Sequence, residues 1–198
     1  VGIEESGSSH GLEVARIAHE MAPKAKLILM NVDDEVDLEN AVDDAIRMGA
    51  NVINHSIGWF NSNFGDGTGP ITEIVEKARE AGIIWVNAAG NQAASHWMGP
   101  NLDEDEDGWI EFAPETEAIE FTMQFPGQID LAFVWNDFPQ TREDYDLYLT
   151  DWTDTVIASS EERQTGFAPP SEQLQHFVER PGLYKIKVRA HDASRPME

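Results

Sequence analysis

The stretch NVINHSIG, residues 51–58, decides the fold that we expect for the first half of the chain. It is a strand-like run that enters a glycine-rich loop. Two similar runs, KLILMNV at residues 26–32 and IIWVNAAGN at residues 83–91, lie on either side of it. Helical patterns separate the three runs, and both faces of each run are apolar. We therefore expect an α/β portion in which helices cover both faces of a parallel sheet.

Three segments have the pattern of amphipathic helices. The first begins near His10 and ends before an Ala-Pro pair. In the second, Asp37 can cap the start and Gly49 marks the end, while the third begins with Pro70 and ends at Gly82. Ligands of such folds bind beyond the carboxyl ends of the strands. The loops that follow the three apolar runs are therefore expected on the functional edge.

The amino-acid composition excludes several classes of protein. The chain has 198 residues, of which 41% are hydrophobic, and this is enough to build a core. It has no cysteine, so disulfides, thiolate metal sites and a cysteine nucleophile are excluded. The formal net charge of −24 disfavours nucleic acids and anionic membranes as partners. No apolar run has the length of a transmembrane segment. The sequence leaves the oligomeric state open.

The pattern changes near residues 98–102. From there on, short strand-like runs separated by turn residues replace the amphipathic helices. This spacing is typical of an all-β sandwich. We therefore expect two domains, an α/β domain over residues 1–98 and a β-sandwich over residues 99–198. The strand-like runs are WIEF, IEFTM, IDLAFVW, YDLYLTD, TVIASS, LQHFV and YKIKVRA.

Three short motifs follow one another in the first half of the chain. They are SSHG with VA just after it, INHSIG, and AAGN. In this order and at these separations they resemble the subtilisin-like serine proteases, over roughly residues 6–95. In the second half, a run ending in Trp, the stretch DYDLYL and the closing GLYKIKV resemble the jelly-roll modules of the pre-peptidase C-terminal type. The second resemblance implies a binding or stabilising module.

The first resemblance implies a role for each matching residue. His10 matches the catalytic histidine, the general base that takes the proton of the nucleophilic serine. Asn91 matches the oxyanion asparagine, whose amide would bind the negative charge of the tetrahedral intermediate. Ser56, Ile57 and Gly58 match the strand edge that pairs with the substrate backbone. A base at a helix start also feels the positive end of the helix dipole, which favours the neutral imidazole.

The sequence departs from the family pattern at several points. Leu12 and Glu13 replace the usual threonine and second histidine, which puts in doubt the packing around His10 but not its role. The family's catalytic aspartate ends a strand that precedes the histidine, and its serine follows the asparagine in a Gly-Thr-Ser motif. Neither element is found in the chain. Ser159 and Ser160 stand in a strand-like run without that context.

The favoured interpretation is a fragment of a secreted, subtilisin-like serine endopeptidase that acts on polypeptides. The aspartate and the serine would lie outside this chain, so the fragment itself is expected to be inactive. The β-sandwich would be inserted between Asn91 and the serine, and the chemistry requires no cofactor. The alternative is a non-catalytic relative that binds calcium, peptide or glycan through its β-sandwich.

The acidic stretch DEDEDGWIEF, residues 103–112, raises a separate question. It places Asp103, Asp105 and Asp107 at alternate positions and then a glycine, as the start of a Ca²⁺-binding loop requires. The twelfth position holds Pro114 instead of glutamate, so the stretch is not an EF-hand loop. Calcium bound by the three aspartates is one interpretation, and a solvated acidic turn is the other.

Overall fold

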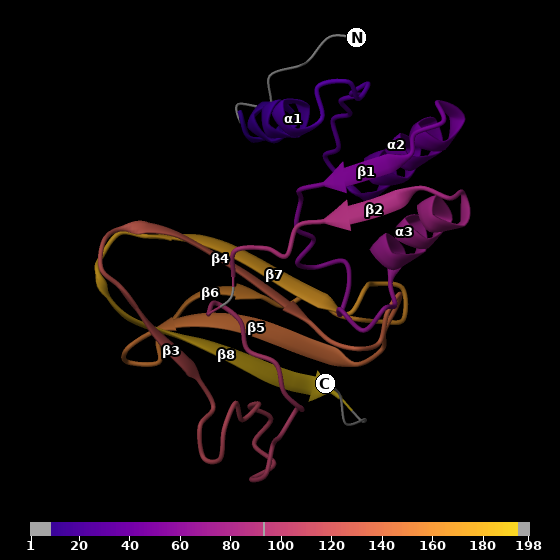
Figure 1. The fold of residues 1–198 in the computed structure, drawn as a ribbon. Coiled ribbons are helices and arrows are strands. Elements are labelled where there is room, and N and C mark those ends of the chain that lie inside the picture. The colour runs from indigo at the N-terminus through magenta and orange to yellow at the C-terminus, as the bar shows by residue number, and fades with distance from the viewer. Residues whose placement is uncertain (1–8, 93, 194–198) are drawn as a thin grey trace. The chain divides into compact units, whose positions relative to one another are not determined.

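The fold is a mixed α/β fold, seen in a computed structural model that describes residues 9–92 and 94–193 (Figure 1). Residues 6–8 and 93 of the stretch that resembles the subtilisin-like proteases lie outside the described residues. The chain divides into two compact units. The first comprises residues 1–58 and 71–91, and the second comprises residues 59–70 and 92–198.

The first unit contains the predicted succession of helices and strands. Its elements are α1 (His10–Met21), α2 (Glu35–Arg47), β1 (Val52–His55), α3 (Pro70–Glu80) and β2 (Ile84–Asn87). The pattern of the sequence thus located all three helices. The helix α1 buries none of its residues, whereas α2 and α3 each bury one apolar stripe. The buried stripes are Leu38, Val42 and Ala45 on α2, and Ile71, Ile74 and Ala78 on α3.

The ends of α2 show where the sequence reasoning was right and where it was wrong. Gly49 ends the helix as predicted, with a φ of 71° that favours glycine. The N-terminal cap, however, is Asp34 and not Asp37. The Asp34 carboxylate accepts a hydrogen bond from the backbone N–H of Asp37 at 2.8 Å. An aspartate three residues earlier is in the extended conformation that a cap needs, which leaves Asp37 inside the first turn.

The sheet of the first unit consists of β1 and β2, which run parallel and are paired from Val52–Ile84 to His55–Asn87. Its two faces differ. His55 is buried and Trp85 is partly buried on one face, whereas Val52, Ile84 and Val86 are exposed on the other. The expectation that helices cover both faces is therefore wrong for the described residues. An apolar sequence on both sides of a strand does not ensure that both sides are covered.

The run at residues 26–32 does not form the predicted strand. It has no regular secondary structure, and Leu27 to Met30 are all exposed. A strand is stable only when a neighbour accepts and donates its backbone hydrogen bonds. Among the described residues, the sheet that this run would join contains β1 and β2 alone. The run is apolar, as a buried strand would be. No described strand lies beside it to pair with its backbone.

The second unit holds two antiparallel sheets. The larger has the order β3 (Ile119–Met123), β8 (Gly182–Asp192), β5 (Asp144–Asp151) and β6 (Val156–Ser160), and the smaller pairs β4 (Gly127–Val134) with β7 (Ser171–Val178). These strands confirm six of the seven strand-like runs. WIEF forms only a single bridge, between Trp109 and Arg189. The finer description as a jelly-roll stays a prediction.

One apolar core holds the two sheets of the second unit together. It draws on both sheets, and Trp135, Tyr145 and Leu149 are almost completely buried in it. Trp135 and Tyr145 pack with ring centroids 5.1 Å apart. Burial raises the pKa of the Tyr145 hydroxyl to about 12. The remaining buried members are Ile110, Ile129, Leu147, Leu174, Val178, Tyr184 and Val188.

Candidate functional site

The candidate site lies beyond the carboxyl ends of β1 and β2. Ser56, Ile57 and Gly58 follow β1 directly, and Asn91 is the fourth residue after the end of β2. The strands are parallel and in register at their last residues, so both segments leave the sheet at the same edge. The backbone N–H of Ala88 extends the pairing by donating to the carbonyl of His55 at 3.0 Å. The structure therefore brings Ser56–Gly58 and Asn91 to one end of the sheet, and their roles stay predictions.

Gly90 shapes the turn that presents Asn91. Its φ of 81° lies in the left-handed region, which a residue with a side chain adopts only at a cost. The turn directs the chain away from β2 immediately before Asn91. Both Asn91 and Ile57 are exposed, so a substrate could reach this edge.

A polar contact under this edge was not predicted from the sequence. His55 Nδ1 lies 2.6 Å from Asn87 Oδ1, and the Trp85 ring packs on the imidazole with centroids 5.1 Å apart. Asn87 Nδ2 donates in turn to the carbonyl of Ala88 at 2.8 Å. The contact between His55 and Asn87 joins the last residues of β1 and β2, directly before Ser56–Gly58. The alternation of β1 could have indicated that His55 faces inward, since it is two residues from Ile53.

His10 is the first residue of α1 and is exposed. This position agrees with the helix start expected from the sequence. Ser9 precedes it as the cap residue, but its side chain makes no capping hydrogen bond. The imidazole therefore stands at the positive end of the helix dipole. Its approach to the edge that carries Asn91 stays a prediction.

The serines of the second unit have other partners. Ser160 lies on β6 and its hydroxyl donates to the carboxylate of Glu172. Glu172 also accepts hydrogen bonds from Gln164 Nε2 at 2.6 Å and from the backbone N–H of Glu162 at 3.1 Å. Ser160 thus belongs to a polar network with Glu172.

The acidic loop also lies in the second unit. Carboxylate oxygens of Asp103, Asp105 and Asp107 come within 4.8 Å of one another. The three residues that the sequence singled out are therefore together in space.

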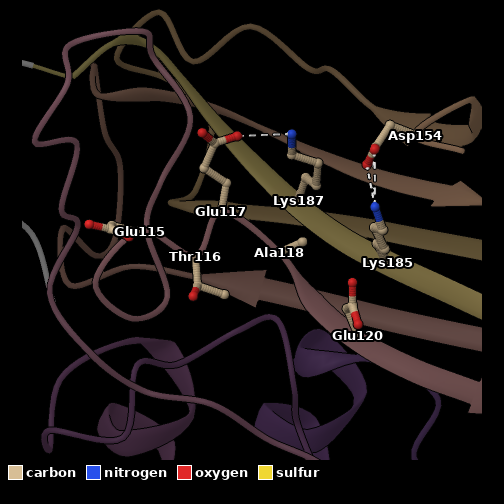
Figure 2. Close-up of a pocket in the computed structure, with 8 residues that line it drawn as sticks. All are labelled: Glu115, Thr116, Glu117, Ala118, Glu120, Asp154, Lys185 and Lys187. Carbon is tan, nitrogen blue, oxygen red and sulfur yellow. Dashed lines mark hydrogen bonds and ion pairs between the residues drawn. The ribbon is translucent and has the colours of Figure 1, made fainter. Parts of the chain in front are cut away.

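A shallow pocket over β3 and β8 contains no predicted site residue (Figure 2). Lys185 Nζ donates to Asp154 at 2.9 Å, and Lys187 Nζ donates to Glu117 at 3.1 Å. Each lysine is thus neutralised by a carboxylate, so the pocket has little attraction for an anionic ligand. Its lining residues are Glu115, Thr116, Glu117, Ala118, Glu120, Asp154, Lys185 and Lys187.

Comparison with known families decides the relationship. The model of the subtilase family, Peptidase_S8, matches residues 3–127, which is more than half of the chain. The chain belongs to the subtilase family. The match begins before His10, includes Asn91 and extends to the first residue of β4, in the second unit. No curated protein matches this subtilase chain in the comparison.

Membership of the subtilase family gives the chemistry in general terms. The family consists of serine peptidases, whose substrates are polypeptides. Within the described part of this subtilase, no helix is both long and apolar enough to cross a membrane.

Proposed function

We propose that this subtilase chain supplies the general base and the oxyanion donor for peptide-bond hydrolysis. His10 takes the proton of the attacking serine and returns it to the leaving amine. The side-chain amide of Asn91 donates to the oxyanion of the tetrahedral intermediate. Ser56, Ile57 and Gly58 hold the substrate backbone in an extended conformation.

One observation carries this proposal. The parallel register of β1 and β2 places the substrate edge and Asn91 at the same end of the sheet. A substrate strand bound along Ser56–Gly58 would present its carbonyl on the side from which the loop after β2 emerges. The match to the family model covers all of these residues, which supports the same assignment.

The proposal includes the absence of hydrolysis by the 198-residue chain on its own. His10 without its aspartate and serine is a base without a nucleophile. A purified chain should therefore release no fluorescent peptide from labelled casein above a buffer blank. Hydrolysis that a serine-directed inhibitor such as phenylmethylsulfonyl fluoride abolishes would contradict this part of the proposal.

The roles of His10 and Asn91 are tested in the protein encoded by the complete gene. If His10 is the base, His10→Ala lowers kcat by several orders of magnitude, and His19→Ala on the same helix leaves kcat unchanged. Asn91→Ala should lower kcat by about 10²- to 10³-fold with little change in KM, the size of effect known for the asparagine of subtilisin in this family. Asn54→Ala is the control for Asn91.

An equal loss of activity in His19→Ala and His10→Ala would show a structural effect, and the assignment of the base would fail. A gene that encodes neither an upstream aspartate strand nor a downstream Gly-Thr-Ser motif would overturn the catalytic role altogether. In that case the non-catalytic alternative would replace it.

A further inference from the structure

The loop of residues 103–111 in the second unit gathers more acid than the three aspartates alone. Asp103, Asp105 and Asp107 each place a carboxylate oxygen within 4.8 Å of the others. Asp105 and Asp107 are exposed, and Asp103 is partly buried. The backbone N–H groups of Asp107 and Gly108 donate to the two carboxylate oxygens of Asp103, at 3.1 and 3.0 Å. A cation between the three carboxylates would offset the repulsion that remains between their charges.

Glu111 is an independent observation at the same loop. Its side chain is only 7% exposed, and its Oε2 atom is buried without a hydrogen-bond partner among the described residues. The carboxylate lies near the loop, where Glu104 is among the residues that act on it. The charges that act on it most strongly are those of Glu104, Asp105 and Asp103. A buried carboxylate oxygen without a partner is costly, and a bound cation would remove that cost.

The base of the loop is fixed to the sheet. The backbone N–H of Ala190 on β8 donates to the carbonyl of Gly108 at 2.8 Å, and Ile110 N–H donates to the carbonyl of Val188 at 2.9 Å. The N–H of Glu111 donates to the carbonyl of Leu102 at 2.7 Å and closes the loop. These bonds fix the backbone of Glu111 at the base of the loop, so the loop needs little further ordering when an ion binds.

We propose that this loop binds a calcium ion through Asp103, Asp105 and Asp107, with Glu111 as the fourth carboxylate. The four residues occupy positions 1, 3, 5 and 9 of the loop, and position 9 often acts through a water molecule in calcium loops. Glu111 thereby provides the acidic group that Pro114 cannot provide at position 12. A set of carboxylates without histidine or cysteine suits a hard cation such as Ca²⁺ and not zinc or copper.

The test is a calcium titration of the 198-residue chain by isothermal calorimetry, in a KCl background that screens the exposed acids. The parent chain should bind one ion per molecule. Asp105→Asn and Glu111→Gln should each weaken binding by about 10- to 100-fold, a loss typical of removing one supporting group at a metal site. The matched control is Glu106→Gln, which removes one charge from the same loop at position 4, outside the proposed ligand set.

Far-UV circular dichroism of each variant separates loss of binding from loss of fold. Asp105 makes no hydrogen bond to the described residues, so its asparagine variant should keep the fold and decides the result even if Glu111→Gln unfolds. Failure of the parent chain to bind at millimolar calcium would overturn the site. Equal weakening by Glu106→Gln and Asp105→Asn would overturn it in favour of a diffuse acidic surface. Unchanged binding by a folded Glu111→Gln would remove Glu111 from the ligand set.

Discussion

His55 and Asn87 face each other across the last register pair of β1 and β2, with Nδ1 and Oδ1 2.6 Å apart. His55 is 6% exposed, so this contact is shielded on one side from water. Because the substrate edge begins at Ser56, the contact joins the two strands at the point where the candidate site starts. Both residues position the site and neither belongs to its proposed chemistry.

Asn87→Ala should loosen this end of the sheet. The variant removes the acceptor of His55 and of the Trp85 indole, which donates to Asn87 Oδ1 at 3.4 Å. We expect a loss of about 1 kcal/mol or more, the usual effect of removing a partner from a shielded polar group. The measurement is hydrogen exchange at the amides of β1 and β2. Asn54→Ala, on the exposed face of β1, is the control, and equal loosening in both variants would refute the prediction.

Lys77 should contribute a stabilisation that depends on salt. Its Nζ on α3 lies 2.6 Å from Asp43 and 3.2 Å from Glu39, both on α2. The hydrogen bond to Asp43, and then that to Glu39, raise the pKa of Lys77. All three side chains are substantially exposed, so the effect of Lys77→Met on Tm should be small and should vanish at about 1 M salt.

The control for Lys77 is Lys24→Met, because Lys24 makes no ion pair with described residues. Its substitution should leave Tm unchanged at both salt concentrations. A decrease in Tm for Lys77→Met that is equally large at high salt would show that packing, and not charge, accounts for the contribution of Lys77.

Glu172 should make the second unit less stable as the pH rises. Burial raises the pKa of its carboxyl, against the hydrogen bonds from Ser160, Gln164 and Glu162 that lower it. The folded state therefore holds the proton more tightly than the unfolded state. The stabilisation is fully present below the pKa of an ordinary glutamate and is lost as the pH rises through the raised pKa.

Glu172→Gln should flatten the fall of the unfolding free energy at pH values above the ordinary pKa of a glutamate, because the amide cannot ionise. The amide can keep the network, with its oxygen facing Gln164 and its nitrogen facing the Ser160 hydroxyl. Glu179→Gln is the control, since it removes one exposed charge just beyond β7. Parallel pH curves for the parent chain and Glu172→Gln would exclude Glu172 as the source.

Leu149→Ala should be among the most damaging substitutions in the second unit. Leu149 is completely buried on β5, the strand that pairs with both β8 and β6. Its truncation leaves a cavity, and we expect a loss of about 2–5 kcal/mol in the free energy of unfolding. Phe167→Ala is the control, because Phe167 is 81% exposed. Denaturant unfolding followed by near-UV circular dichroism compares them, and similar losses would contradict the assigned core.

Much of the fold follows from local patterns in the sequence. Alternation predicted the strands of the second unit from β3 onward, because one face of each packs on the common core. Helical spacing predicted α2 and α3 for the same reason, since each buries a single stripe. Such patterns show which face of an element is buried, and a few neighbouring residues are enough to reveal that face.

What depended on partners elsewhere was predicted less well. Residues 26–32 have the composition of a strand, yet strand formation depends on a neighbour that the pattern does not specify. The loops after β1 and β2 were expected at one edge of the sheet, and they lie there because the two strands are parallel. The contacts of His55 with Asn87 and of Glu111 with the acidic loop depend on register and burial, so no local pattern revealed them.

The open face of the β1–β2 sheet has a consequence for the colloidal behaviour of the chain. Val52, Ile84 and Val86 form an aliphatic strip exposed to water, and the strong negative charge of the chain opposes the approach of two such strips. The isoelectric point is near 4.3. Acidification toward that value removes the repulsion while leaving the strip unchanged. Self-association should therefore set in on mild acidification, before the folded units themselves come apart.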